Sequence, residues 1–351
     1  MLIREATPDD NAELQEAQAK CPQGTTLVVS TVNTPDFFAR VKAYEDYIVY
    51  VASEDNHIIG SAACAIRDAV VNEKVVQVGH HFQIFVIPDY RGKGVAKQLH
   101  EHCEGYLTQK SVAMSYAFIM EGNLPSMYRI ERQGFKRHHT LVMPGLAVFR
   151  KMDASSQFKI RPVLTDDLVT VADLLNDTWQ GHELRETMSA ERLSQFVTRT
   201  PGYTFDNLFV LEDRGEILAC LGFWDWSKVT RITVERLNRR MQVFGFLSDI
   251  ASYFRQMPSV PRPGETLKQM VLTPIGFKDP KHLGILLRYV NNVALRSDIG
   301  YIYCICERDH PLLTSMKGFA RIDTTMYLYI KPIRENISIS NKPVFLNGVD
   351  L

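Results

Sequence analysis

Hydrophobic and polar positions follow two different periods along the chain, and each period predicts one kind of element. Alternating runs rich in β-branched and aromatic residues predict strands over residues 47–62, which surround a polar turn, and over residues 75–87. A period of about 3.6 residues predicts an amphipathic helix over residues 95–107. The apolar stripe of this helix consists of Val95, Leu99, Cys103 and Tyr106. The mixture of strands and amphipathic helices predicts an α/β fold (α+β) with a mixed sheet.

The beginning of this pattern occurs twice. Residues 3–10 and 160–167 both combine a short strand, a Thr/Asp cap and the start of a helix. A two-stranded hairpin pattern follows in each copy, at residues 47–62 and again at residues 208–221. The chain therefore reads as two units of one α/β type in tandem.

The ends of the two copies also agree, because each has a strand, a turn, a short helix and a Gly-Phe pair. These pairs are Gly134-Phe135 and Gly318-Phe319. We predict units over residues 1–152 and 158–335, joined by a small polar linker, with residues 336–351 as a tail that either folds back as an edge strand or frays. The second unit is longer because residues 227–264 insert a basic helical pattern and a Pro-rich turn.

The most informative motif lies where the strand over residues 75–87 meets the helix over residues 95–107. Main-chain N–H groups at such a turn and in the first helical residues lack helical partners, so they can converge on an anion. The turn and first helical residues are Arg91, Gly92, Lys93, Gly94, Val95 and Ala96. The two glycines permit close approach, and the two basic residues add positive charge. This predicts a pyrophosphate cradle, whereas the Walker A and dinucleotide glycine motifs are absent.

The pattern Arg91-x-x-Gly94-x-Ala96 resembles the acyl-CoA signature of the GNAT superfamily of N-acyltransferases, and the resemblance extends over most of residues 1–150. It implies two tandem GNAT-like domains and a strand splayed from its neighbour. Main-chain groups of Phe85 and Ile87, with Val86 between them, would then pair with the pantetheine arm and the thioester oxygen.

The resemblance also assigns roles after the next strand. Asn123 would hydrogen-bond the pantetheine, although an Asn at this place is also an ordinary helix cap. Tyr128 would place its phenol at the CoA sulfur and donate a proton to the leaving thiolate. The alternative is that Tyr128 only packs.

His80 and His81 are adjacent on the splayed strand, so alternation sends them to opposite faces. Amine acylation needs a base, and imidazole is suited to this near neutral pH. We favour His81, because it lies seven residues before Pro88, where many GNAT members carry a glutamate for this purpose. A packing role is the alternative for each histidine.

The second unit departs from the family pattern. Its corresponding turn, residues 276–284, lacks the Arg-x-x-Gly-x-Gly/Ala pattern and contains the acidic Asp279, and no tyrosine matches Tyr128. We therefore predict a degenerate, noncatalytic copy of the catalytic domain, which could still wall the substrate cleft.

The composition of the chain bears on whether it binds nucleic acid, a membrane or a metal. Forty basic and forty acidic residues give a net charge of zero, which disfavours nucleic acid as a partner. No apolar run is long enough for a membrane span, and the first residues lack a secretory pattern, so we expect a cytoplasmic protein. The six cysteines lack zinc-site spacing, so we expect reduced thiols and no metal.

The sequence thus predicts an N-acetyltransferase that moves an acetyl group from acetyl-CoA to a primary amine of a small molecule or peptide. The alternative is a noncatalytic acyl-CoA sensor or protein-interaction module. A homodimer is compatible with either, and neither the amine nor the acyl length can be derived from the sequence.

Overall fold

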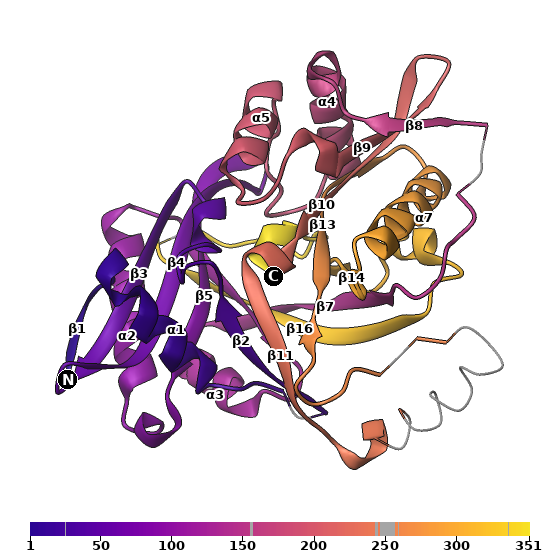
Figure 1. Cartoon of the computed structure of the whole chain (residues 1–351). Coiled ribbons are helices and arrows are strands. Elements are labelled where there is room, and N and C mark those ends of the chain that lie inside the picture. Colours follow the sequence, from indigo (N-terminus) through magenta and orange to yellow (C-terminus); the bar gives the residue numbers. More distant parts are fainter. Residues whose placement is uncertain (25, 155–156, 243–244, 246–256, 259, 336) are drawn as a thin grey trace.

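We analysed a computed structural model of the chain, which describes all residues except 25, 155–156, 243–244, 246–256, 259 and 336 (Figure 1). The first half contains helices α1 (Asn11–Ala19), α2 (Val95–Gln109) and α3 (Leu124–Arg132). Its strands are β1 (Leu2–Glu5), β2 (Leu27–Asn33), β3 (Asp46–Glu54), β4 (His57–Val71), β5 (Lys74–Val86), β6 (Met114–Met120) and β7 (Lys136–Ala147).

The second half has the same kind of order. Its helices are α4 (Leu168–Thr178), α5 (Ala190–Arg199) and α7 (Pro280–Arg296). Its strands are β8 (Lys159–Pro162), β9 (Leu208–Asp213), β10 (Glu216–Asp225), β11 (Thr230–Leu237), β12 (Thr266–Leu267), β13 (Gln269–Phe277), β14 (Tyr301–Tyr303), β15 (Cys306–Glu307) and β16 (Arg321–Pro332). The predicted mixed α/β fold is confirmed.

One large sheet runs through both halves. Its strand order is β1-β3-β4-β5-β6-β16-β7-β14-β13-β10-β9-β8, with β15 beside β7. The last strand of the second half, β16, therefore lies between β6 and β7 of the first half and is antiparallel to both. In turn, β7 pairs with β14 of the second half, with Tyr301 opposite Ala147. The two halves thus exchange strands, and neither completes its own sheet.

A small second sheet joins the halves at another place. Strand β2 of the first half pairs with β11, which belongs to the segment inserted in the second half, and β11 pairs with β12. Most of the helical pattern predicted for this insertion falls on residues 243–244 and 246–256, which lie outside the described residues, as do residues 155–156 of the predicted linker.

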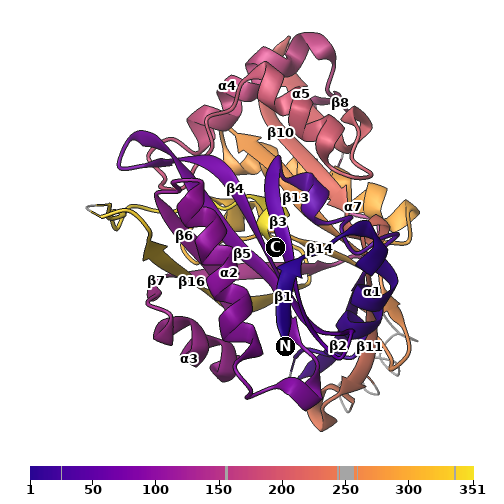
Figure 2. The ribbon, with the colours of Figure 1, turned by 90° about the vertical axis from the view of Figure 1, so that its left-hand side faces the viewer.

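The two faces of the first-half strands are covered by different helices, as Figure 2 shows for α2. Apolar side chains of α2 pack on one face, where Val95, Leu99 and Cys103 join a cluster with residues of β3 and β4. The opposite face packs against α1, α4 and α5 in a separate cluster. That second face is therefore the one turned towards the second half.

Within the described residues, no helix has the length and apolar character to cross a bilayer.

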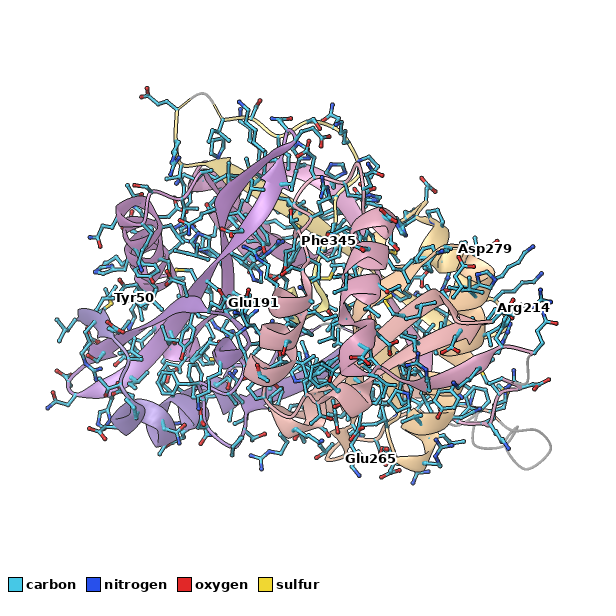
Figure 3. The ribbon with its side chains drawn as sticks, turned by 90° about the horizontal axis from the view of Figure 1, so that it is seen from above. Tyr50, Glu191, Arg214, Glu265, Asp279 and Phe345 are labelled. Atoms are coloured by element: carbon cyan, nitrogen blue, oxygen red, sulfur yellow. The ribbon has the colours of Figure 1, made fainter. Side chains whose placement is uncertain are left out.

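The C-terminal segment is neither frayed nor an edge strand. Val344, Leu346 and Gly348 to Asp350 are buried, and Gly348–Asp350 form a short 3-10 turn in the middle of the molecule. Seen from above, Phe345 lies where the two halves meet, whereas Tyr50 and Asp279 lie towards the outside (Figure 3). The segment therefore contributes side chains to the junction of the two halves.

The exchange of β16 predicts that the two halves unfold together. Leu328 of β16 is fully buried, so Leu328→Ala is expected to lower the free energy of unfolding by about 2–5 kcal/mol. Ile322 on the same strand is 68% exposed, so Ile322→Ala serves as the control. All three tryptophans lie in the second half, so their fluorescence reports the unfolding of that half, whereas far-UV circular dichroism reports the whole chain. If the halves unfold together, the two denaturation curves coincide. Two separated transitions would contradict the prediction.

Candidate functional site

The amino end of α2 is open to an anion. Gly92 and Gly94 have positive φ values of 78° and 84°, and a Cβ at either position would meet no atom within 4 Å. Gly94 is the N-cap and provides no side chain to cap the helix. The main-chain N–H groups of residues 92–96 make no hydrogen bond to any described residue. The amino terminus of this helix therefore presents unpaired amides, as the sequence predicts.

Two basic side chains flank these amides. The Nε of Arg91 donates to the carbonyl of Val86 at 3.0 Å, which fixes the turn to the end of β5. Lys93 lies over the ring of Tyr90, with its Nζ at 4.5 Å from the ring centre. Both basic residues are exposed. Their charges add to the positive end of the helix dipole at this surface.

Strands β5 and β6 separate beside the cradle. They pair in parallel at three positions only, and the last of these joins His80 to Tyr116. Beyond this point β5 continues to Val86, with an irregularity at Gln83, whose φ is +51°. The splayed strand pair implied by the GNAT resemblance is thus present, with its apex at His80.

The main-chain groups that face this gap differ from the predicted ones. The N–H of Ile87 donates to the carbonyl of Ile59 at 3.0 Å, so it points to β4 and is not free. Because N–H directions alternate along a strand, the N–H of Val86 points away from β4, towards the gap. The Ile87 N–H is therefore not available as the donor that the resemblance implies. The sequence does not show which N–H groups of this strand face β4 and which face the gap.

His81 points to the face covered by α2. Its Nε2 lies 3.0 Å from Oε1 of Glu104, and its ring stacks on His100 with 4.2 Å between ring centres. Glu104 also accepts from Ser115 at 2.9 Å and from Lys331 of β16 at 2.6 Å. Burial alone would lower the pKa of His81, but Cys103 and Glu104 outweigh burial and raise it. This histidine therefore belongs to a buried ion-pair cluster.

Three potential metal ligands meet in this cluster, namely His81, His100 and Glu104. The two imidazole planes are inclined by only 19° and are stacked. Ring nitrogens bind a metal in the plane of their ring, so two stacked rings cannot both point at one ion about 2 Å away. Lys331 also binds Glu104 directly. The described geometry therefore fits ion pairing and not metal binding.

His80 points to the opposite face, towards the second half. Its Nδ1 lies 3.1 Å from the hydroxyl of Tyr44. Tyr44 and Tyr116 place their hydroxyls 3.0 Å from the two carboxylate oxygens of Asp350, and each can donate to that carboxylate. Arg67 donates to the Tyr116 hydroxyl at 2.9 Å. A buried polar network thus begins at the apex of the gap and ends in the C-terminal segment.

Charge and burial set the protonation of this network. Burial, followed by Arg40 and Arg67, lowers the pKa of His80 well below its usual value. Burial also raises the pKa of Tyr44 and Tyr116 well above theirs. At neutral pH the imidazole is thus uncharged and both phenols keep their protons. Sequence reasoning missed Tyr44, Tyr116 and Asp350, because residues so far apart in sequence carry no common motif.

Asn123 and Tyr128 both lie on or next to α3. The side-chain oxygen of Asn123 caps α3 by accepting from the Ser126 N–H at 3.4 Å. The side chain of Tyr128 is 59% exposed and contacts Arg132 of the next turn. Gln133, directly after α3, donates to the carbonyl of Lys97 at 3.4 Å, which holds α3 beside the first turn of α2. The helix that carries the two predicted residues therefore contacts α2 through Gln133.

The amino end of α7 is closed, in contrast to that of α2. Asp279 is its N-cap and accepts from the Lys281 N–H at 2.7 Å. Pro280, the first helical residue, has no N–H to offer. A carboxylate of the chain itself thus occupies the place where α2 leaves its amides unpaired.

Comparison with known proteins agrees with this geometry. Residues 12–135 match the family model described as the acetyltransferase (GNAT) family. This match covers the cradle, both histidines and α3. No curated protein matches the chain by sequence.

Solved structures extend the likeness beyond residues 12–135. N-myristoyltransferase of Saccharomyces cerevisiae, solved with bound myristoyl-CoA, has a TM-score of 0.67 at 12% identity and covers 99% of this chain and 90% of its own. A GCN5-related N-acetyltransferase from Sphaerobacter thermophilus has a TM-score of 0.57 at 12% identity and covers 96% of this chain and 97% of its own. At such identities the likeness shows a shared fold, and this fold covers both halves of the chain.

The Glu104 cluster predicts an effect on stability. Burial would raise the pKa of Glu104, but His81 and Lys331 outweigh burial and lower it to about 2. Because this folded-state pKa lies below the ordinary value of 4.5, Glu104 stabilises the fold above that pH, and the contribution is lost as the pH falls towards 2. Glu104→Ala is expected to cost about 3 kcal/mol at neutral pH.

Glu101 provides the matched control for this prediction, because it lies on the same helix and is exposed. Glu101→Ala should change the free energy of unfolding by less than about 0.5 kcal/mol. Chemical denaturation at neutral pH and near pH 3 measures both variants. Equal losses in the two variants would contradict a special role for Glu104.

Proposed function

We propose that the protein is an N-acetyltransferase, which moves an acetyl group from acetyl-CoA to a primary amine of a small molecule or peptide. The observation that carries this proposal is the set of unpaired amides over residues 92–96, at an uncapped helix end beside a splayed strand pair. Acyl transfer in general is supported by the GNAT domain itself. The acetyl group and the amine acceptor are our proposal.

The cradle would hold the pyrophosphate of CoA. Amides of residues 92–96 would donate to phosphate oxygens, with Arg91 and Lys93 adding charge. The pantetheine arm would run along the gap between β5 and β6, where the N–H of Val86 faces it and Asn123 borders it. The N–H groups along this part of β5 would also stabilise the oxyanion that forms on the thioester oxygen.

The chemical step is attack of a neutral amine on the thioester carbonyl. A C–N bond forms, the C–S bond breaks, the nitrogen loses a proton to a base and the thiolate receives a proton. We assign the last role to Tyr128, whose phenol is exposed on α3, the helix that contacts α2 through Gln133. No covalent enzyme intermediate is needed.

The base is better placed at His80 than at His81. His81 is held by Glu104 on the α2 face. His80 lies on the face turned towards the second half, is uncharged, and its Nε2 makes no hydrogen bond to a described residue. Nitrogen becomes strongly acidic once the C–N bond forms, so an imidazole of low pKa can still accept its proton. Tyr44 and Asp350 would orient the ring through Nδ1.

A negative charge placed at residue 94 should weaken CoA binding. Gly94→Asp places a negative charge in the open space at the N-cap of α2, so the variant should bind CoA at least about tenfold more weakly, a change of about 1.4 kcal/mol. Gly181→Asp is the control, because Gly181 also has a positive φ, of 79°, and open space at its Cβ. Calorimetric titration with acetyl-CoA measures both. Unchanged affinity of Gly94→Asp would refute the cradle.

Substitutions of His80 and of His81 should have different effects on catalysis and stability. His80→Gln is expected to lower kcat by about a hundredfold while sparing the affinity for acetyl-CoA, because only proton transfer is lost. His81→Gln is expected to lower stability and to leave kcat of the folded enzyme nearly unchanged. CoA release followed with a panel of amines measures kcat. A loss of kcat in His81→Gln without a loss of stability would indicate that His81, and not His80, is the general base.

CoA binding without product from any amine of the panel would favour a noncatalytic acyl-CoA sensor.

A further inference from the structure

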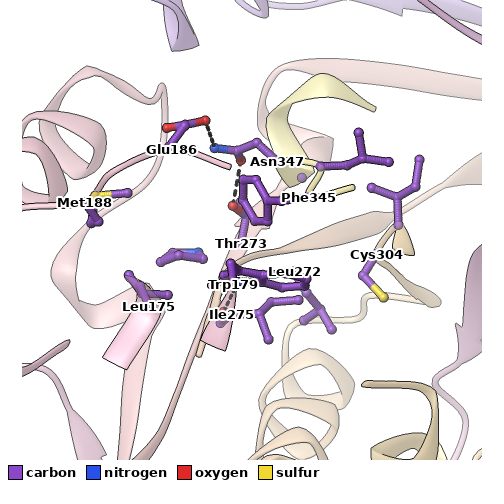
Figure 4. A pocket seen from close by; sticks show the side chains of 14 residues that line it. Leu175, Trp179, Glu186, Met188, Leu272, Thr273, Ile275, Cys304, Phe345 and Asn347 are labelled. Carbon is purple, nitrogen blue, oxygen red and sulfur yellow. Dashed lines mark hydrogen bonds between the residues drawn. The ribbon is translucent and has the colours of Figure 1, made fainter. Parts of the chain in front are cut away.

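The second half contains a gap of the same kind as the one between β5 and β6. Strands β13 and β14 pair in parallel at three positions, the last of which joins Val271 to Tyr303, and then separate. A pocket lies in this second gap, lined by Leu272 to Ile275 and by Cys304 and Ile305. Figure 4 shows this pocket from close by.

The interior of the pocket is small and mostly apolar. Leu175, Trp179, Met188 and Phe345 complete its walls. Its free volume is about 40 Å³, which is room for roughly three water-sized spheres. A short alkyl group has this size, whereas a benzene-sized ring occupies a cavity of about 150 Å³.

A carboxylate forms the polar end of the pocket. The side-chain NH2 of Asn347 donates to Oε1 of Glu186 at 2.9 Å, as Figure 4 shows. The orientation of this amide is fixed, because its oxygen accepts from the Thr273 hydroxyl at 2.9 Å and from the Val349 N–H at 3.2 Å. A main-chain N–H can only donate, so the NH2 group of Asn347 must face Glu186. Glu186 therefore acts as an acceptor.

The second oxygen of this carboxylate is available to a ligand. The Oε2 atom of Glu186 makes no hydrogen bond to a described residue, and it is not sealed from the surface. The side chain of Glu186 is 20% exposed, so water can reach the same end of the pocket. An apolar pocket with a few polar groups at one end is the usual form of a small ligand site.

The negative charge at this end is only partly compensated. Among the described residues, Arg67 is the cation that pairs with Glu186, with its Nη1 at 3.4 Å from Oε1. The same guanidinium lies 3.5 Å from Oδ2 of the buried Asp350. One cation thus serves two carboxylates, which leaves a net negative charge in this group of three. A cationic ligand beside Glu186 would compensate that charge.

We propose that this pocket binds a compact primary alkylammonium ion. Its ammonium group would donate to Oε2 of Glu186, and its alkyl group would fill the apolar interior. A divalent metal ion would need several oxygen ligands, and Glu186 offers one free oxygen. A neutral alkyl ligand would cover the carboxylate without pairing its charge. This inference goes beyond the proposed function, because it assigns a second binding site that does not depend on acetyl transfer.

Ligands of similar size and different charge test the proposal on the whole protein. Propylammonium should bind at least about tenfold more tightly than 1-propanol, because only the ammonium pairs with the carboxylate, and propionate should not bind. Tetramethylammonium controls for general attraction of cations, since it has no N–H to donate. Calorimetric titration at constant ionic strength measures all four. Equal affinities for propylammonium and either 1-propanol or tetramethylammonium would overturn the proposal.

Removing the charge should remove the preference for the amine. Glu186→Gln keeps the size of the side chain, so it should weaken propylammonium binding at least about tenfold and leave that of 1-propanol unchanged. Glu191→Gln is the matched control, because Glu191 is exposed on α5 and does not line the pocket. Equal losses of affinity in the two variants would contradict a site at Glu186.

Filling the pocket gives a test that leaves the charge in place. The main chain of Met188 bonds to the side chain of Asn176 through both its N–H and its carbonyl, so Met188→Trp should keep the loop in place while its side chain occupies the pocket. Propylammonium binding should weaken at least about tenfold. Val169→Trp, at an exposed position of α4, is the control. Unchanged affinity in Met188→Trp would refute the pocket as the site.

A primary alkylammonium can be a free amine or the side chain of a lysine in a peptide. Nα-acetyl-lysinamide distinguishes these sources: binding as tight as that of butylammonium assigns the site to lysine side chains, and weaker binding assigns it to free amines.

The affinity for acetyl-CoA separates this inference from the proposed function. Gly94→Asp, which should weaken CoA binding, should bind propylammonium as the unaltered protein does. If propylammonium binds and acetyl-CoA does not, only the proposed function fails. If acetyl-CoA binds and propylammonium does not, only the alkylammonium site fails.

Discussion

The exchange of β16 is the constraint on which the rest of the structure depends. This strand pairs with β6 over seven positions and with β7 over ten, so it closes a sheet that neither half completes alone. It also holds the edge of β6 that faces away from the gap. Because β6 is fixed there, β5 can diverge from it beyond His80 without leaving β6 unpaired on both sides. The opening of the first gap is therefore supported by a strand from the second half.

The amino ends of α2 and α7 occupy corresponding places in the two halves, but they differ in their capacity to bind an anion. In α2, glycines with positive φ leave the amides bare and accessible, and basic residues surround them. In α7, a carboxylate and a proline satisfy or remove the corresponding donors. Few residues are needed for this difference, since a helix end attracts anions unless something covers it. The duplication of the fold thus does not imply a duplication of the chemistry.

Features that depend on short segments of the chain could be predicted from the sequence, whereas contacts between distant segments could not. The repeat, the glycine turn before α2 and the opposite faces of His80 and His81 follow from periodicity and spacing within short segments, and the structure has all three. The exchange of β16 could not be predicted, because two strands of similar pattern compete for one edge and only tertiary packing decides between them. The contact between His81 and Glu104 also depends on tertiary packing, so the sequence did not indicate it. Which face of β5 is turned to the second half depends on how the halves assemble.

The C-terminal segment connects the two halves physically. Gly348 packs so closely on β13 that a Cβ there would lie 2.7 Å from the carbonyl oxygen of Leu272, so the segment is fixed against the second half. Two residues later, the buried carboxylate of Asp350 is compensated by Tyr44, Tyr116 and Arg67 of the first half. A buried charge without such partners would be costly, so the segment cannot shift against one half without a penalty at its contacts with the other.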